Sequence, residues 1–151
     1  MVKEILTYPK NKDILTSKSE EVKDISQIQD LIQDLKDTLN NSTGCGISAV
    51  QIGVLKKVCL IKINNKIYVL INPVITRKRG EILFREGCLS APGLYTQTKR
   101  AQKVWCQYLD EYGNQQEFAE GGLASVIIQH ELDHFEGWCE VFNEIKEESN
   151  V

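Results

Sequence analysis

Gln129-His130-Glu131-Leu132-Asp133-His134 is the stretch on which the fold and the chemistry of this sequence depend. Its two histidines stand four residues apart, so on a helix they lie one turn apart on the same face, where both imidazoles can reach one metal ion. Glu131 lies about 100° further round the helix than His130, where its carboxylate can touch a metal-bound water without being a ligand. The chain contains 2 histidines and both are in this stretch, which indicates a metal site rather than two unrelated polar groups.

The residues around this motif predict a buried helix with definite ends. Gly121-Gly122 precedes it, and Leu123, Val126 and Ile127 share the side of the histidines. The remaining sides are apolar as well, which is typical of a helix at the centre of a domain. Gly137 follows the motif at a position that suits a C-terminal cap.

An amphipathic helix is predicted nearer the N-terminus, over residues 26–41. Apolar side chains recur there on one stripe, as in a helix that covers a core. Ser26 and Gln29 have the spacing of a capping box, which would fix the start of this helix.

Two β-hairpins are predicted between the helices. Residues 58–63 and 66–71 are rich in β-branched side chains and are joined by two asparagines, and Asn72-Pro73 is expected to end the second strand. Residues 103–110 and 115–119 form the second pair.

This order of helix, strands and helix is typical of the α+β class. We expect antiparallel strands packed around a central buried helix that carries the HExxH motif, with the N-terminal amphipathic helix beside them. A chain of 151 residues predicts a single catalytic domain over 1–151, in which 143–151 form a short polar acidic tail.

The composition is that of a soluble globular protein, with 42% hydrophobic and 26% charged residues. A net charge of −3 gives no reason to expect nucleic acid as a partner. No apolar run reaches membrane-spanning length and the N-terminus lacks the apolar core of a signal peptide, so we expect no membrane association and a cytoplasmic location. The 5 cysteines form no CxxC pair, and their odd number in such a chain favours free thiols, one of which is available to a metal.

A catalytic zinc-type centre usually has three protein ligands, so the source of the third ligand decides the function. Downstream, the spacing after Gly137 partly imitates that of metzincins, but Glu140 stands where their third histidine belongs. The only methionine is Met1, so the later Met-turn of that class is missing as well. The other zincin arrangement needs a glutamate from the acidic tail, namely Glu144, Glu147 or Glu148.

Upstream, Cys88 is a second source for the third ligand. It lies in Glu86-Gly-Cys-Leu-Ser90, which we predict to be a tight glycine turn after a short apolar run. A thiolate binds zinc or ferrous iron strongly, whereas a free cysteine is often only a small buried side chain. The residues alone leave both interpretations of Cys88 open.

Three motifs taken together resemble the signature motifs of the peptide deformylase family. They are Gly44-Cys-Gly-Ile-Ser-Ala-Val-Gln51, Glu86-Gly-Cys-Leu-Ser90 and Gln129-His-Glu-Leu-Asp-His134, in that order. The second matches the family pattern EGCLS in full, and the third matches QHExDH. The first departs from GxGLAAxQ at Ile47 and Ser48, and the resemblance covers most of the chain.

The resemblance implies a metal-dependent hydrolase that removes the N-formyl group from the N-terminal formylmethionine of newly made peptides and releases formate. Cys88, His130 and His134 would bind one divalent metal per chain, with water in the fourth position. Family members typically use ferrous iron, Fe(2+), and accept Zn(2+), Ni(2+) or Co(2+).

The resemblance also assigns roles around the metal. Glu131 would act as general base and then as the acid that protonates the leaving amine. The side-chain amide of Gln51 and the backbone N–H of Leu89 would hold the oxyanion. Glu86 is expected to orient the site, and Ser48 adds a hydroxyl that needs a hydrogen-bonding partner if it is buried.

N-formylmethionyl peptides (nascent chains) are therefore the expected partner, bound as an added strand beside the glycine loop. The candidate substrate-binding residues are Gly44, Cys45, Gly46, Ile47, Phe84, Glu86, Gly87, Val126 and Ile127. Phe84, Val126 and Ile127 would form the slot for the methionine side chain, although plain core packing explains each of them equally well. Some longer family members dock on the ribosome through a basic C-terminal helix, and the acidic tail here makes such docking doubtful.

Two alternatives to the deformylase stay open. One is an HExxH-type zinc metallopeptidase. The other is a non-catalytic protein whose Cys88/His130/His134 site only staples the fold. A structural site of that kind closes with a fourth protein ligand, for which Cys45 and Cys139 are available.

Overall fold

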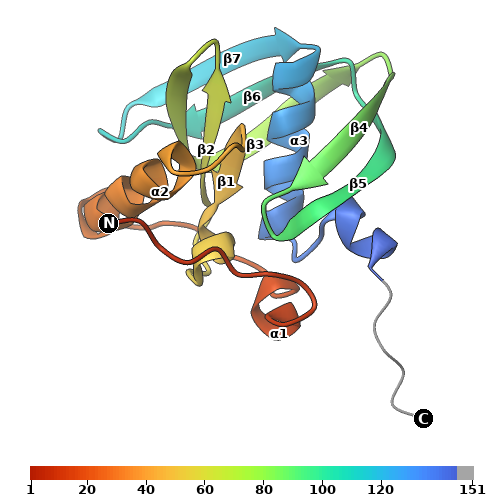
Figure 1. Cartoon of the computed structure of the whole chain (residues 1–151). Helices are drawn as coiled ribbons and strands as arrows, with labels where there is room; N and C mark the ends of the chain where they lie inside the picture. Colours follow the sequence, from red (N-terminus) through yellow and green to blue (C-terminus); the bar gives the residue numbers. More distant parts are fainter. Residues whose placement is uncertain (146–151) are drawn as a thin grey trace.

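The structure is a computed structural model that describes residues 1–145. It contains two antiparallel β-sheets (Figure 1). The larger sheet has the order β1-β2-β3-β6-β7 and consists of β1 (Gly46–Ser48), β2 (Val58–Ile63), β3 (Lys66–Arg79), β6 (Lys103–Leu109) and β7 (Gln115–Gly121). The smaller sheet pairs β4 (Ile82–Cys88) with β5 (Ala91–Arg100). The α-helices are α1 (Lys12–Leu15), α2 (Gln29–Asn40) and α3 (Leu123–Phe135), and 3-10 helices cover Ile25–Ile28, Ala49–Ile52 and Glu140–Glu144. The predicted α+β class with antiparallel strands is confirmed.

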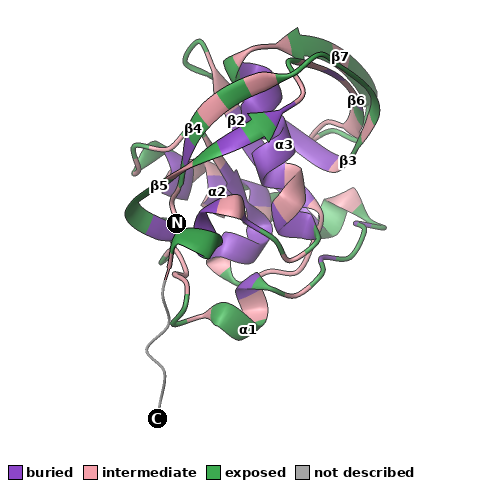
Figure 2. Ribbon diagram, turned by 90° about the vertical axis from the view of Figure 1, so that its right-hand side faces the viewer, coloured by how far each residue is buried: buried purple, intermediate pink, exposed green. Residues whose placement is uncertain are grey.

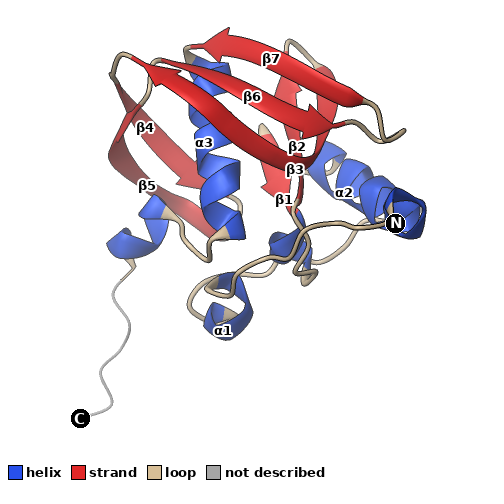
Figure 3. Ribbon diagram, turned by 180° about the vertical axis from the view of Figure 1, so that it is seen from behind, coloured by secondary structure: helices blue, strands red, loops and turns tan. Residues whose placement is uncertain are grey.

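Helix α3 lies between the two sheets (Figures 1 and 3). It contacts β1, β2 and β7 of the larger sheet and β5 of the smaller one. Most of its residues are buried, including both histidines, and its ribbon is largely purple in Figure 2. A helix covered from both sides has almost no solvent-exposed face, which explains why its sequence outside the metal motif is largely apolar.

Strand β2 and the first half of β3, residues 67–71, are covered on both faces, so their sequences are largely apolar. Alternate side chains along a strand point to opposite faces of the sheet. One set packs with α3 and consists of Cys59, Ile61 and Leu70. The other set packs with α2 and consists of Val58, Leu60, Val69 and Ile71.

Both predicted hairpins are present, with β2 paired to β3 and β6 paired to β7. Asn64 and Asn65 have φ angles of 51° and 64°, the left-handed conformation that a two-residue hairpin turn requires. The predicted end of a strand at Asn72-Pro73 is wrong, because β3 runs through it. Asn72 has a φ of 50° and the pairing register shifts there, so the strand bends and changes its partner from β2 to β6.

The smaller sheet is where the sequence prediction failed. The segment from Glu86 to Cys88 is not a glycine turn, since it forms the end of β4, and the chain turns at Leu89-Ser90. Strand β5 had no hydrophobic alternation to reveal it. Its inward positions near the C-terminal end are the polar residues Thr98 and Arg100, which are both buried.

Helix α2 begins differently from the prediction. The predicted capping box of Ser26 and Gln29 is wrong. Asp24 caps the preceding 3-10 helix instead, and its side chain accepts a hydrogen bond from the Ser26 backbone N–H at 3.0 Å. The α-helix then follows from Gln29 without a side-chain cap of its own. Its apolar stripe packs on the core through Ile32, Leu35 and Leu39.

The C-terminal part of the chain is more structured than the predicted polar tail. Asn143 and Glu144 belong to the 3-10 helix, and Ile145 packs against a buried cluster that includes Val141 and Phe142. The rest of the predicted tail, 146–151, lies outside the described residues. None of the helices within 1–145 is long and apolar enough to cross a membrane.

The chain leaves α3 through a clamped glycine. Gly137 has a φ of 76°, in the left-handed region that suits the residue after a helix. A Cβ at this position would lie 2.3 Å from the carbonyl oxygen of Thr16. The loop after the metal-motif helix is therefore packed directly against the N-terminal segment.

Gly137→Ala is expected to destabilise the protein more than Gly93→Ala. Gly93 has nearly the same φ, 77°, but a Cβ there meets nothing within 4 Å. Both variants bear the cost of a left-handed residue, about 1–2 kcal/mol. Gly137→Ala adds a backbone collision worth about 1–3 kcal/mol. Urea unfolding of the two variants measures the difference, and equal losses would contradict the clamp.

Candidate metal centre

Four side chains with metal-binding atoms meet at one point. The sulfurs of Cys88 and Cys139 and ring nitrogens of His130 and His134 all lie within 4.8 Å of one another. Cys88 Sγ is 3.5 Å from His134 Nε2, and Cys139 Sγ is 4.0 Å from His130 Nε2. Cys88 comes from the end of β4, the histidines from α3, and Cys139 from the loop after α3.

These separations suit one small divalent cation. Donor atoms bound at the usual zinc–nitrogen and zinc–sulfur distances of a tetrahedral centre are about 3.3–3.8 Å apart. The Cys88–His134 and Cys139–His130 separations, 3.5 and 4.0 Å, lie close to this range, and the remaining pairs lie within 4.8 Å. Imidazole and thiolate are also the donors that zinc and ferrous iron accept. The residues therefore fit a single divalent metal.

The orientation of His130 is set by a buried carboxylate. Nδ1 of His130 is 2.8 Å from Glu86 Oε1, so the ring donates its Nδ1 proton to Glu86 and turns Nε2 toward the cluster. Glu86 also accepts hydrogen bonds from Arg100, whose Nε is 2.7 Å from Oε2, and from Thr98 Oγ1. Arg100 extends the network by donating to Asp133 Oδ2 at 2.7 Å.

The network keeps Glu86 ionised. Burial by itself raises the pKa of a carboxyl group, but hydrogen bonds from Arg100, His130 and Thr98 reverse this effect and lower the pKa of Glu86 to about 2. The folded-state pKa is therefore below the unfolded one. Glu86 stabilises the fold above about pH 4.5, and this contribution is lost as the pH falls toward 2.

The second histidine is fully buried. Burial lowers the pKa of His134, so its imidazole is neutral. Its Nδ1 has no hydrogen-bonding partner among the described residues, and its Nε2 faces Cys88. A neutral imidazole with Nε2 free to donate its lone pair is the form that binds a metal.

The two sulfurs interact with one another as well. A hydrogen bond with Cys88, with a further contribution from His130, lowers the pKa of Cys139 to about 5, while the pKa of Cys88 is raised. The thiol of Cys139 is therefore the more readily ionised of the two.

Glu131 is held close to the metal cluster by an unexpected partner. Ser48, which departs from the family motif, is fully buried and donates its hydroxyl toward Glu131 Oε2 at 2.8 Å. The other carboxylate oxygen lies against Gly46, where a Cβ would be 2.8 Å from Oε1. Burial raises the pKa of Glu131 to about 7, against the opposing effects of His130 and Ser48. A carboxyl group with that pKa can take and return a proton near neutral pH.

Gln51 has its amide group fixed at both ends. Its Oε1 accepts a hydrogen bond from the Ser48 backbone N–H at 2.8 Å. Its Nε2 donates to Ser90 Oγ at 3.1 Å and lies 3.7 Å from Cys88 Sγ. The amide N–H group therefore points toward the cluster, as a donor to an oxyanion must.

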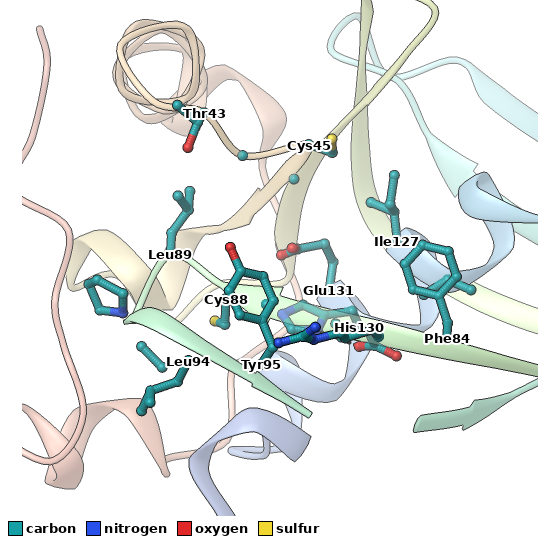
Figure 4. A pocket seen from close by; sticks show the side chains of 18 of the residues that line it. Thr43, Cys45, Phe84, Cys88, Leu89, Leu94, Tyr95, Ile127, His130 and Glu131 are labelled. Carbon is teal, nitrogen blue, oxygen red and sulfur yellow. Dashed lines mark hydrogen bonds and ion pairs between the residues drawn. The ribbon is translucent and has the colours of Figure 1, made fainter. Parts of the chain in front are cut away.

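A cavity of about 470 Å³ opens beside the cluster (Figure 4). Its wall includes Cys88, His130 and Glu131, and Figure 4 shows Leu89 on one side of them and Phe84 and Ile127 on the other. Most of the predicted substrate-binding residues line it, namely Gly44, Cys45, Gly46, Phe84, Glu86, Gly87, Val126 and Ile127. Ile47 is not part of this wall, because its side chain is fully buried in the core beside α2.

Sequence reasoning missed several residues of this region. Leu94 and Tyr95 line the cavity from β5, the strand that the pattern did not reveal. Arg100 belongs to the same strand, so its contact with Glu86 was hidden for the same reason. Ser48 gave one signal in the sequence, because a buried hydroxyl requires a hydrogen-bonding partner, but the sequence did not identify that partner.

The fold and the site together define a class, an α+β metalloprotein with an HExxH helix and a thiolate from a neighbouring strand. Comparison with known proteins makes this specific. A family model described as polypeptide deformylase matches residues 2–150. Peptide deformylase of Thermodesulfovibrio yellowstonii is 40% identical over 140 residues, which cover 89% of this chain and 84% of that protein.

Solved structures agree with this result. Peptide deformylase from Thermus thermophilus has a TM-score of 0.87 at 33% identity and covers 97% of this chain and 87% of its own. The structure from Synechococcus elongatus, a complex with actinonin, has a TM-score of 0.86 at 31% identity, with 91% and 75% covered. The chain belongs to the peptide deformylase family.

Arg100→Leu is expected to destabilise the protein by about 3–5 kcal/mol, because it leaves the Glu86 carboxylate buried without its partner. Lys99→Ala is the control, since Lys99 is exposed and only 4.0 Å from Glu81, and we expect a loss below about 1 kcal/mol. Denaturant unfolding at pH 7 measures both. Similar small losses in the two variants would contradict the structural role of Arg100.

Proposed function

We propose that this protein removes the N-formyl group from the N-terminal formylmethionine of newly made peptides and releases formate. Cys88, His130 and His134 would hold one divalent metal per chain for this reaction. The observation that carries the proposal is the wall of the cavity, where Cys88 and His130 lie beside the buried carboxylate of Glu131. Such an arrangement offers a metal, a base and space for a small carbonyl group in one place.

A divalent metal held by Cys88, His130 and His134 would supply Lewis-acid chemistry, lowering the pKa of a water and polarising the formyl carbonyl. The remaining steps belong to the chain. Glu131 accepts a proton from the attacking water and passes it to the leaving amine, a sequence that suits its pKa of about 7. Gln51 Nε2 and the Leu89 backbone N–H donate to the oxygen that becomes negative in the transition state.

The substrate would lie along the glycine loop. Within residues 1–145, strand β1 pairs with β2 alone and lies at one edge of the larger sheet. An extended peptide can add to such an edge through main-chain hydrogen bonds. Phe84, Val126 and Ile127 line the cavity and offer an apolar surface to the methionine side chain. The cavity thus supports the methionine-slot role for these three side chains, which pattern alone could not separate from core packing.

Ferrous iron is the metal we propose in vivo, with zinc, nickel or cobalt as substitutes. A thiolate and two imidazoles accept all four ions, so the choice among them depends on availability. We also propose a cytoplasmic location, where newly made formylated chains are found. One domain is proposed for the whole chain, because the centre draws on β4 and α3 together.

The position of the candidate additional ligands distinguishes the two alternative functions. For a metallopeptidase, the candidates Glu140 and Glu144 do not belong to the described metal cluster, and Glu147 and Glu148 lie outside the described residues. For a non-catalytic staple, Cys45 is exposed and apart from the cluster, but Cys139 is part of it. Family membership and the open cavity favour the enzyme.

The protein purified anaerobically with ferrous iron or nickel is expected to release formate from formyl-Met-Ala-Ser. Glu131→Gln should retain the metal and lose about two to four decades in kcat, because it removes the proton carrier without removing a ligand. Glu136→Gln, an exposed carboxylate on the same segment, should keep full activity. Formate assay with metal analysis on each sample measures this. Absence of formate from a metal-loaded wild-type sample would refute the proposed reaction.

Ser48→Ala is expected to move the acidic limb of the pH–rate profile to higher pH. Ser48 stabilises the charged form of Glu131, so its loss raises the pKa of the base, which is active only when ionised. Ser125→Ala is the control. Ser125 is fully buried like Ser48, but it lies on α3 and its hydroxyl donates to the carbonyl oxygen of Ala101. The profile of kcat/KM from pH 5 to 9 distinguishes them. An unshifted limb in Ser48→Ala would show that Ser48 does not tune the base.

A further inference from the structure

Cys139 is the one member of the metal cluster that the proposed three-ligand centre does not use. Its side chain is 1% exposed and follows α3 by a short loop. Its sulfur is 4.0 Å from His130 Nε2 and within 4.8 Å of the donor atoms of Cys88 and His134. We propose that Cys139 is a fourth, displaceable protein ligand, so that the resting centre is a closed set of two thiolates and two imidazoles.

The position of this sulfur is fixed by the backbone around it. Gly137, two residues earlier, is held against the Thr16 carbonyl. Cys139 itself has an extended backbone, with φ −153° and ψ 124°, and begins the 3-10 helix of Glu140–Glu144. Neighbouring Val141 and Phe142 are buried and anchor the other end of the loop. The thiol is therefore presented to the cluster by a segment clamped on both sides.

Cys139 approaches the cluster from the side away from the substrate. The cavity is lined by Cys88, His130 and Glu131, whereas among the described residues neither His134 nor Cys139 is part of its wall. Cys139 belongs instead to the buried cluster with Leu15 and other core side chains. A metal bound by all four side chains would thus be reached by substrate from the opposite face, with the cavity unobstructed.

The four-ligand centre has a consequence for turnover. A tetrahedral metal with four protein ligands has no position for water, which is the arrangement of structural zinc sites. For hydrolysis, the metal–sulfur bond to Cys139 would have to break, with the electron pair staying on sulfur as a thiolate, while a water from the cavity side, beside Glu131, would complete the coordination. Displaceability thus rests on the proposed function, whereas ligation itself does not. Ligation by Cys139 would therefore lower the rate of formate release and strengthen metal binding.

Zinc X-ray absorption on the full-length protein loaded with one equivalent of zinc tests ligation directly. We expect two sulfurs at about 2.3 Å in the wild type and one in Cys139→Ala. The dissociation constant for zinc should rise at least about tenfold in Cys139→Ala. Formate release per bound metal should be at least as fast as in the wild type. Cys139→Ser, which keeps the size of the side chain, is the second variant if the alanine variant does not fold.

Cys106→Ala is the matched control, because Cys106 is also fully buried but lies in β6 outside the cluster. It should retain two sulfurs and the wild-type affinity. A single sulfur in the wild type, or two in Cys139→Ala, overturns the proposal and leaves the deformylase function untouched. Two sulfurs in the wild type with no formate from either protein supports ligation by Cys139 and refutes the proposed function and, with it, displaceability. Slower formate release per bound metal in Cys139→Ala overturns displaceability alone.

Discussion

The buried carboxylate of Glu86 is the constraint on which the arrangement of this protein depends. A charge at that depth is tolerated only if it is fully paired. Its partners come from different elements, with His130 on α3, and Thr98 and Arg100 on β5. The smaller sheet and the helix therefore have to dock together, because separating them would leave a carboxylate and a guanidinium without partners.

The same carboxylate gives the metal centre its geometry. By accepting the Nδ1 proton of His130 it decides which nitrogen faces the cluster, a choice that the helix alone does not make. It also lies two residues before Cys88 on β4, so the contact that orients His130 also places the Cys88 thiol close to the histidines. Docking and ligand placement are thus one event, and the fold cannot form in the native arrangement without assembling the centre.

Helix α3 separates two environments around that centre. On the cavity side, Glu131 is held between the hydroxyl of Ser48 and the bare backbone of Gly46. On the core side, His134 and Cys139 are enclosed by apolar side chains. The cavity side thus presents the carboxylate of Glu131, whereas the core side encloses two of the four side chains of the metal cluster. Burial raises the pKa of Glu131 into the neutral range, although His130 and Ser48 act in the opposite direction.

The sequence by itself determined the local features of this protein. The spacing of His130 and His134, the apolar run of α3 and the two hairpins all depend on residues near one another in the chain, where periodicity and turn chemistry act. The resemblance of three motifs was enough to predict the family and to place Cys88 beside the histidines.

Only the tertiary structure decided the rest. Strand β5, with polar residues at its inward positions, has no pattern of its own, and Arg100 is explained only by Glu86 on the neighbouring strand. Ser48 meets Glu131 across 83 residues, and Cys139 meets Cys88 through the docking of the smaller sheet. These contacts join segments that are far apart in the chain, and no local sequence pattern indicates which distant segment each one meets. They are decided only when the core packs.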